Sequence, residues 1–216
     1  MPVISVVSRK GGSGKTTVAV HLAVAALTEG LATCVIDTDP QASAATWGDW
    51  RVSGNPLEVI TCPPLRLRLT VDKLLRSGTE VVVIDTPPHA DDAAREAVRV
   101  ADLVIIPTRP RSFDLKALEG ITDVVSAKGK PGFVLINSVP PRATQILAHA
   151  TDYATCLGLD VCPVHFGERG SFHHYAAAGA VAGEMDPDGK AAAEVDALWR
   201  WAKGMLELET PGTAQR

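Results

Sequence analysis

The sequence lacks the features that would place the protein in a membrane or send it out of the cell. It contains no run of about 18 apolar residues, so we expect no helix that spans a bilayer. The N-terminus enters an apolar, strand-like segment at once, and we therefore expect no signal peptide. Internal repeats, low-complexity tracts and interdomain linkers are also missing. These absences favour a globular domain in the cytoplasm.

Cysteine is scarce, and positive charge is not in excess. The four cysteines lie far apart without a C-x-x-C pair, at Cys34, Cys62, Cys156 and Cys162. This spacing favours buried, reduced thiols in a cytoplasm. The formal net charge of −4 gives no overall attraction to nucleic acid, so any DNA contact must come from a local basic patch.

Short apolar runs alternate with amphipathic segments almost to the end of the chain. This alternation predicts an α/β fold, with a mostly parallel twisted sheet flanked by helices on both faces. The expected strands are 3–8, 32–37, 80–85, 103–108, 133–138 and 161–166, with a weaker strand at 57–60. The expected helices are 16–29, 71–77, 91–100, 115–127, 143–157 and 190–207. We expect a single domain over residues 1–209 and a frayed tail at 210–216.

The most informative segment is Lys10-Gly-Gly-Ser-Gly-Lys-Thr-Thr17, which lies between an expected strand and an expected helix. Strand, glycine-rich loop and helix form the context of a phosphate-binding loop, in which backbone N–H groups and the helix N-terminus face the phosphates. Lys15 would reach the β- and γ-phosphates, and the Thr16 hydroxyl would take a place on Mg²⁺. The sequence therefore predicts a site for ATP and Mg²⁺. Its expected nucleotide-binding residues are Gly11, Gly12, Ser13, Gly14, Lys15, Thr16 and Thr17.

This loop departs from the usual pattern G-x-x-x-x-G-K-[ST], because Arg9 stands at the first glycine and a second lysine, Lys10, opens the loop. It resembles the deviant Walker A motif, K-G-G-x-G-K-[ST], of the ParA/MinD family of ATPases, which includes the nitrogenase iron protein. The resemblance implies that Lys10 crosses a dimer interface and touches the ATP of the partner subunit, where it would stabilise the transition state. The cysteine spacing does not suggest an iron–sulfur cluster, which argues against the nitrogenase branch.

Two further segments resemble this family. Ile36-Asp-Thr-Asp-Pro-Gln41 resembles its D-x-D-P-Q segment, which implies that Asp39 orients or activates the attacking water and that Asp37 lies nearer the metal. Taken alone, an Asp-Pro turn stays open as the alternative. Val81-Val-Val-Ile-Asp85 resembles Walker B, which implies that Asp85 holds Mg²⁺ through water. Residues 86–92 would then form a switch loop that senses the γ-phosphate.

The remaining site assignments rest on single residues. Asn137 follows a buried strand, where family members often place an asparagine that hydrogen-bonds adenine, and a turn asparagine is the alternative. Residues 107–110 resemble the family's proline-rich segment near the dimer interface. Arg169 and Arg142 are the candidates for DNA contact, although a solvated charge is the alternative for each. Further basic residues cluster around one expected helix, at Arg66, Arg68, Lys73 and Arg76.

The resemblance implies a ParA-like ATP hydrolase with weak intrinsic activity. It would form an ATP-dependent homodimer, bind nucleoid DNA without sequence preference, and hydrolyse ATP when a ParB-like or cargo-bound adaptor stimulates it. Such proteins segregate plasmid or chromosomal DNA or position cargo. Because the loop begins at residue 10, we expect no helix-turn-helix domain before it.

Three alternatives stay open. A MinD-like membrane-directed ATPase would need a last helix with a polar face rich in Lys and Arg. Here Arg200 and Lys203 stand against Glu194, Asp196, Glu207 and Glu209, so we expect a core-docked helix without membrane binding. A metabolic P-loop enzyme would have no need of Lys10. A nucleotide-switched regulator without DNA contact is the third.

Overall fold

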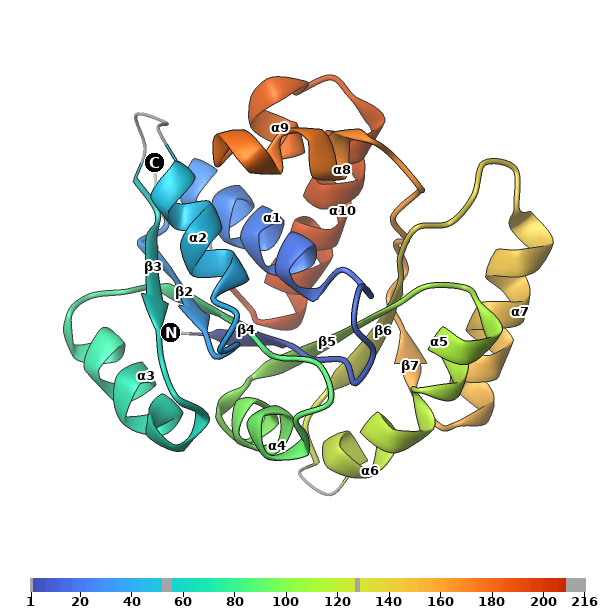
Figure 1. The fold of residues 1–216 in the computed structure, drawn as a ribbon, viewed down its shortest axis with the longest axis horizontal. Helices are drawn as coiled ribbons and strands as arrows, with labels where there is room; N and C mark the ends of the chain where they lie inside the picture. The colour runs from blue at the N-terminus through green and yellow to red at the C-terminus, as the bar shows by residue number, and fades with distance from the viewer. Residues whose placement is uncertain (1, 52–55, 127–128, 209–216) are drawn as a thin grey trace.

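The computed structural model describes residues 2–51, 56–126 and 129–208, so the tail expected at 210–216 lies outside the described residues. At its centre is a seven-stranded sheet in the order β3-β2-β4-β1-β5-β6-β7, in which all paired neighbours are parallel (Figure 1). The strands are β1 (Val3–Val6), β2 (Thr33–Asp37), β3 (Glu58–Thr61), β4 (Val81–Asp85), β5 (Leu103–Thr108), β6 (Gly132–Ile136) and β7 (Asp160–Val161). The predicted α/β class is confirmed.

Helices cover both faces of this sheet (Figure 1). One face carries α1 (Lys15–Thr28), α2 (Ser43–Trp50), α8 (Ser171–His174), α9 (Ala182–Met185) and α10 (Lys190–Met205). The other face carries α3 (Leu67–Arg76), α4 (Asp91–Val100), α5 (Ser112–Lys116), α6 (Glu119–Ser126) and α7 (Thr144–Cys156). Two short 3-10 turns lie at η1 (Pro64–Arg66) and η2 (Ala176–Ala178).

The central strands are buried on both faces, which explains their nearly continuous apolar sequences. Successive side chains of a strand point to opposite faces. In β1, Ile4 and Val6 join the core beneath α1 and α10, whereas Val3 and the following Val7 join the core beneath α3 and α4. Every residue of β1, β2, β4 and β5 is buried, so the ends of these strands are held rigidly where the loops begin.

Most expected elements differ from the structure only in where they begin or end, as in α3, which begins at Leu67 instead of residue 71. Two differ by more than that. The strand expected at 161–166 is wrong beyond its first residue, because Pro163 has no N–H group and interrupts the ladder. The chain still follows β6, since the N–H of Phe166 donates to the carbonyl of Ile136 at 3.0 Å. The single helix expected at 115–127 is divided into α5 and α6 by a turn at residues 117–118.

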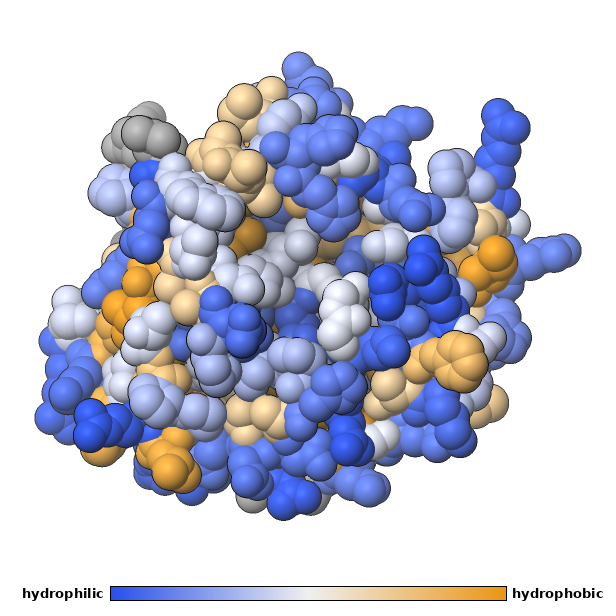
Figure 2. Space-filling view, in the orientation of Figure 1, coloured by the Kyte–Doolittle hydropathy of each residue, from blue (hydrophilic) through white to orange (hydrophobic). Residues whose placement is uncertain are grey.

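The last helix docks on the core. Val195, Leu198, Trp199 and Ala202 of α10 are buried in the core beneath α1, and the ring of Trp201 packs edge-on against Phe133 at 4.8 Å. The expectation of a core-docked helix is confirmed. In the described part of the chain, no helix is long and apolar enough to cross a membrane. Figure 2 shows that the face above the carboxyl ends of the strands is largely polar, with small, separate apolar patches.

Candidate nucleotide-binding site

The loop between β1 and α1 has the backbone of a phosphate cradle. Gly12 and Gly14 adopt positive φ angles of 70° and 99°, a conformation that glycine adopts without strain. Gly14 caps α1 without a side-chain hydrogen bond, so the first N–H groups of the helix are left to an anion. A Cβ atom at Gly14 would lie 2.1 Å from Nδ2 of Asn137 and would displace that side chain, so both this contact and the positive φ favour glycine. These features fit the predicted roles of the loop.

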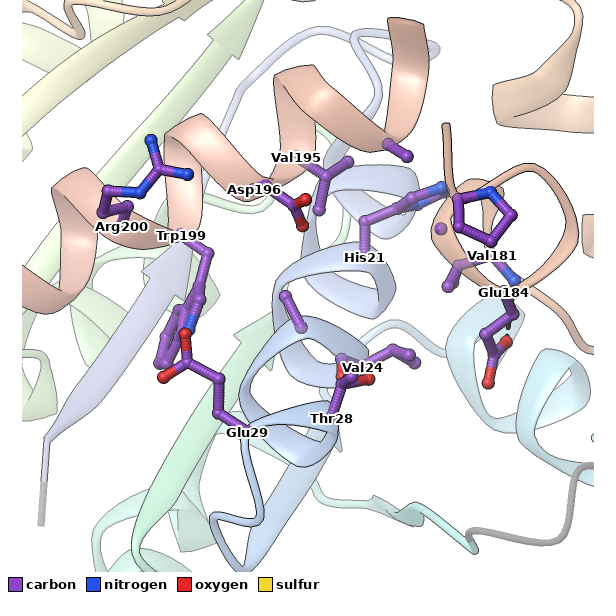
Figure 3. A pocket seen from close by; sticks show the side chains of 14 residues that line it. His21, Val24, Thr28, Glu29, Val181, Glu184, Val195, Asp196, Trp199 and Arg200 are labelled. Carbon is purple, nitrogen blue, oxygen red and sulfur yellow. Dashed lines mark hydrogen bonds between the residues drawn. The ribbon is translucent and has the colours of Figure 1, made fainter. Parts of the chain in front are cut away.

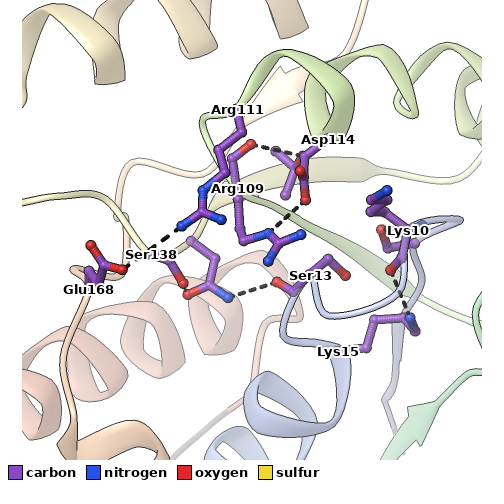
Figure 4. Close-up of polar contacts among 11 residues, drawn as sticks. Lys10, Ser13, Lys15, Arg109, Arg111, Asp114, Ser138 and Glu168 are labelled. Atoms are coloured by element: carbon purple, nitrogen blue, oxygen red, sulfur yellow. Dashed lines mark hydrogen bonds and ion pairs between the residues drawn. The ribbon is translucent and has the colours of Figure 1, made fainter.

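The two lysines of the loop differ in their surroundings (Figure 4). Lys15 is buried, and its Nζ donates to the backbone carbonyl of Lys10 at 3.3 Å. Burial lowers the pKa of Lys15, and the nearby carboxylates of Asp85 and Asp39 oppose that shift. Because burial disfavours an unpaired charge, a bound phosphate would stabilise the Lys15 ammonium by acting as its anionic partner. Lys10 is only half-buried, and its ammonium makes no hydrogen bond or ion pair with any described residue.

Thr16 and Asp85, the two residues expected to hold Mg²⁺, are hydrogen-bonded to each other. The Thr16 hydroxyl donates to Oδ2 of Asp85 at 2.6 Å, while Oδ1 of Asp85 is buried without a partner among the described residues. Burial raises the pKa of Asp85 to about 7, against the hydrogen bond from Thr16. A hydroxyl beside a carboxylate with a vacant oxygen is a donor set that suits Mg²⁺, which usually brings phosphate oxygens and water as its other ligands. These residues therefore fit a Mg²⁺ ion that arrives with the nucleotide.

Asp37, at the end of β2, and Asp39, in the loop that follows, make different hydrogen bonds. Both oxygens of the buried Asp37 accept backbone N–H groups, Oδ1 from Asp39 at 2.9 Å and Oδ2 from Ala45 at 3.0 Å. Asp37 thereby ties the loop to the first turn of α2, a helix that the sequence did not predict. Asp39 is half-buried and accepts the N–H of Gln41 through Oδ1 at 2.8 Å, while its Oδ2 accepts no hydrogen bond from any described residue. That free oxygen suits the predicted water-positioning role better than the oxygens of Asp37 do.

Asn137 clamps the loop from the end of β6. Its Nδ2 donates to the carbonyl of Ser13 at 2.7 Å, and its Oδ1 accepts the N–H of Ser138 at 2.8 Å. The side chain is thus oriented by the loop in addition to any contact with adenine, which stays a prediction. The clamp joins residues 124 positions apart, so sequence patterns could not reveal it.

His21 is a second contact that sequence reasoning missed. Its Nε2 accepts the N–H of Ala182 in α9 at 3.2 Å, so its proton lies on Nδ1, which donates to the carbonyl of Thr17 at 2.7 Å. Burial lowers its pKa to about 4. His21 also lines a cavity of about 510 Å³ between α1, α9 and α10, together with Glu29 and Trp199 (Figure 3). The first turn of the nucleotide-binding helix is therefore tied to α9 by a neutral imidazole.

The two arginines predicted to contact DNA lie in unequal settings. Arg169 donates through Nε and Nη2 to the Glu194 carboxylate, so the charge of Arg169 is already paired. The same carboxylate also accepts the N–H of Gly167. Arg142 is exposed and has no ion pair within the described residues. Both line a cavity of about 340 Å³ with His165 and Lys190. Arg142 is the better placed of the two to meet a phosphate backbone.

Comparison with known proteins agrees with this site. Residues 4–164 match the model of the CobQ/CobB/MinD/ParA nucleotide-binding domain, so the chain belongs to that family. Its curated relatives include carboxysome distribution proteins, a ParA protein and a chromosome-partitioning ATPase. A carboxysome distribution protein A of Gloeobacter kilaueensis is 37% identical over 143 residues, 65% of each chain. Protein ParA of Rhizobium radiobacter is 33% identical over 53% of this chain and 51% of its own. The chain thus spans less than two thirds of the length of both.

Solved structures confirm the fold. The apo McdA structure from Cyanothece has a TM-score of 0.75 at 16% identity, over 95% of this chain and 99% of its own. MinD from Aquifex aeolicus has a TM-score of 0.76 at 18% identity, over 94% and 98% of the two chains. Members of this family are generally ATP hydrolases that bind nucleotide with Mg²⁺.

Proposed function

We propose that the protein is a ParA-like positioning ATPase that dimerises on ATP, binds DNA without sequence preference and hydrolyses ATP slowly until a partner protein stimulates it. The observation that carries this proposal is the unequal pair of lysines. The ammonium of Lys15 donates to the carbonyl of Lys10 in its own loop, whereas the ammonium of Lys10 has no partner within the described residues. A cation that its own subunit leaves free is available to a nucleotide held by a second subunit.

In the proposed reaction, water attacks the γ-phosphorus and the bond to the bridging oxygen of the β-phosphate breaks, which gives ADP and phosphate. Lys15 and the loop amides hold the β- and γ-phosphates, and Asp39 orients the water through the oxygen that Gln41 leaves free. Lys10 of the second subunit neutralises charge on the transferred group. Mg²⁺, when bound beside Thr16 and Asp85, would neutralise charge on the phosphate oxygens.

The test compares two lysine variants by sedimentation and nucleotide titration with ATP and Mg²⁺. Lys10→Ala should bind ATP as a monomer and fail to dimerise or turn over, because its contact is made only across the interface. Lys15→Ala should fail to bind. The exposed Lys73 on α3 gives a matched control in these assays, which contain no DNA, since Lys73→Ala removes the same charge from outside the loop. A normal ATP-dependent dimer of Lys10→Ala would remove the main support for the proposal.

DNA binding is proposed to come from local patches, because the net charge is −4. Arg142 is exposed, and four further cations around α3 are exposed without ion pairs among the described residues, at Arg66, Arg68, Lys73 and Arg76. Binding to random duplex DNA should require ATP and fall steeply with salt, since phosphate contacts release counterions. Arg142→Glu should weaken it more than Arg169→Glu, whose charge is already paired with Glu194. Preference for one short duplex would contradict this part of the proposal.

We further propose that the partner is a ParB-like or cargo-bound adaptor and that the protein acts on the nucleoid in the cytoplasm. Its relatives include a chromosome-partitioning ATPase Soj of Thermus thermophilus, 26% identical over 77% of each chain, and two carboxysome distribution proteins. Co-sedimentation with DNA and with liposomes, each with ATP, tests this directly. Binding to liposomes alone would favour a membrane-directed positioner instead.

A further inference from the structure

The loop after β5 brings a third cation to the phosphate-binding loop. Arg109 follows β5 directly, and its Nη1 lies 3.8 Å from the position that a Cβ atom on Gly12 would occupy. Its Nε donates to Oδ1 of Asp114 in α5 at 2.7 Å (Figure 4). The guanidinium is 23% exposed and the Asp114 carboxylate 5%, so this ion pair is partly buried. Asp114 therefore orients Arg109 against Gly12.

The remaining donors of Arg109 are unused. A guanidinium has five N–H donors, and the hydrogen bond to Asp114 takes only the one on Nε. Neither Nη atom of Arg109 donates to a described residue, and both belong to the fork that suits phosphate oxygens. Arg51 and Arg169 differ in this respect, because each gives Nη donors to a glutamate. Arg9 is also paired through Nε, with Asp91 at 3.1 Å, but of these four arginines it is Arg109 whose Nη1 lies beside Gly12.

The order of the strands explains why such a residue stands here. β1 delivers the phosphate-binding loop, and its neighbours in the sheet are β4 on one side and β5 on the other. The end of β4 supplies Asp85, whose carboxylate faces Thr16. The end of β5 supplies Arg109 at the opposite flank, beside Gly12. A triphosphate in the loop would thus meet a metal-binding carboxylate on one flank and a fixed guanidinium on the other.

We propose that Arg109 contacts the terminal phosphate of ATP held by its own subunit, with Asp114 as the positioning residue that orients it. This inference rests on the proposed ATP site and adds a residue that selects ATP over ADP. Each lysine ammonium acts as a point charge, whereas a guanidinium whose two Nη atoms are unpaired can donate to two oxygens of one phosphoryl group. ADP has no γ-phosphate and would leave that fork unpaired.

The test is the affinity of Arg109→Gln for the nonhydrolysable analogue AMPPNP and for ADP, each with Mg²⁺, measured by calorimetric titration. Loss of a charge-assisted pair of hydrogen bonds should raise the Kd for AMPPNP about 10- to 100-fold and that for ADP less than about threefold. Asp114→Asn should give a smaller loss of the same selectivity, because the guanidinium keeps its charge but loses its orienting partner. Arg109→Lys should keep only part of the selectivity for AMPPNP over ADP.

Arg111→Gln is the matched control, since it removes the same charge two residues away. Arg111 is 60% exposed and lies 4.0 Å from Glu168, so both affinities should be unchanged. If Arg109→Gln lost affinity for AMPPNP and for ADP equally and had a lower melting temperature, the role of Arg109 would be structural and the proposal would be overturned. Unchanged AMPPNP binding with a lost dimer would also overturn it, because the contact would then lie across the interface. If wild type bound neither nucleotide, the proposed function itself would fail.

Discussion

The two flanks of the phosphate-binding loop are chemical opposites. On the flank of β4 and β2, Asp85 and Asp39 present carboxylate oxygens, and the vacant oxygen of Asp85 is buried. On the flank of β5 and β6, Arg109 and Asn137 present N–H donors against Gly12 and Ser13. The loop itself, with Lys15, lies between them. In the proposed reaction, the acceptors lie where a metal ion and water would be needed, and Arg109 lies where phosphate oxygens would be held.

This contrast separates two tasks that one loop must perform. Binding a triphosphate needs donors and positive charge, whereas hydrolysis needs a positioned water and a metal ion. Because the two groups of side chains come from different strands, a substitution on one flank should change affinity and a substitution on the other should change rate. The predictions below test that separation, from the largest expected effect to the smallest.

Lys15→Ala should abolish both tasks. Lys15 is the buried cation of the loop, and its nearest carboxylates, Asp85 and Asp39, would then face the phosphates without compensation. Loss of a charge-assisted contact to two phosphate groups should reduce ATP affinity by more than about 100-fold. Calorimetric titration with ATP and Mg²⁺ measures the effect. Tight ATP binding by this variant would mean that the loop has been misassigned.

Asp39→Ala should reduce rate but not affinity. Lys10, Lys15, Thr16 and Asp85 would still hold Mg·ATP, so nucleotide binding and dimerisation should survive. Removing a water-positioning group typically costs about 10²- to 10⁴-fold in rate. ATP turnover and the dimer fraction should be measured in the same preparation.

The control for Asp39 is Asp37, whose oxygens are both engaged by backbone N–H groups. Asp37→Asn should lower the melting temperature because it disturbs the link to Ala45, whereas Asp39→Ala should leave that temperature nearly unchanged. Turnover at the wild-type rate in Asp39→Ala would contradict the catalytic assignment and make Asp37 the next candidate.

The sequence predicted one flank of the site better than the other. The glycine-rich loop comes shortly after the buried β1, and Asp85 is the last residue of the buried β4, so local patterns put both at strand ends, where the structure has them, while their roles stay predictions. The roles of Asn137, His21 and Arg109 depend on contacts with Ser13, Ala182 and Gly12, which are distant in the sequence and adjacent only once the sheet is assembled. The expected strand at 161–166 was wrong for a local reason, the missing N–H of Pro163.

His21 should make stability depend on pH without belonging to either flank. Its pKa falls from the ordinary 6.5 to about 4 on folding, so between these values the unfolded state binds more protons and stability declines as the pH is lowered. A shift of this size corresponds to about 3 kcal/mol, present above pH 6.5 and lost as the pH falls to 4. Denaturant unfolding at pH 7.5 and 5 measures it.

The matched variant is His21→Gln, which does not titrate. Its neutral amide can still accept the N–H of Ala182, so the protein should fold and lose less stability between pH 7.5 and 5 than wild type does. Glu184 and His173 also act on His21, and both are unchanged in the variant. An identical pH dependence in the two proteins would contradict the assignment.

Asn137→Ala should give the smallest effect and mark the donor flank most clearly. The substitution removes the hydrogen bond from Nδ2 to the Ser13 carbonyl and the one that Oδ1 accepts from Ser138. A hydrogen bond of this kind contributes about 1 kcal/mol, so ATP and ADP affinity should each fall about 5- to 10-fold. Turnover at saturating ATP should stay near the wild-type rate, since Asp39 and Asp85 are untouched.

Asn137→Asp keeps the acceptor for Ser138 but replaces the donor with a second oxygen, and it should weaken binding further because the new charge faces a carbonyl. Titration beside steady-state turnover separates the two quantities. A loss of turnover without a loss of affinity in Asn137→Ala would show that the donor flank takes part in the chemical step, and the division between the two flanks would not hold.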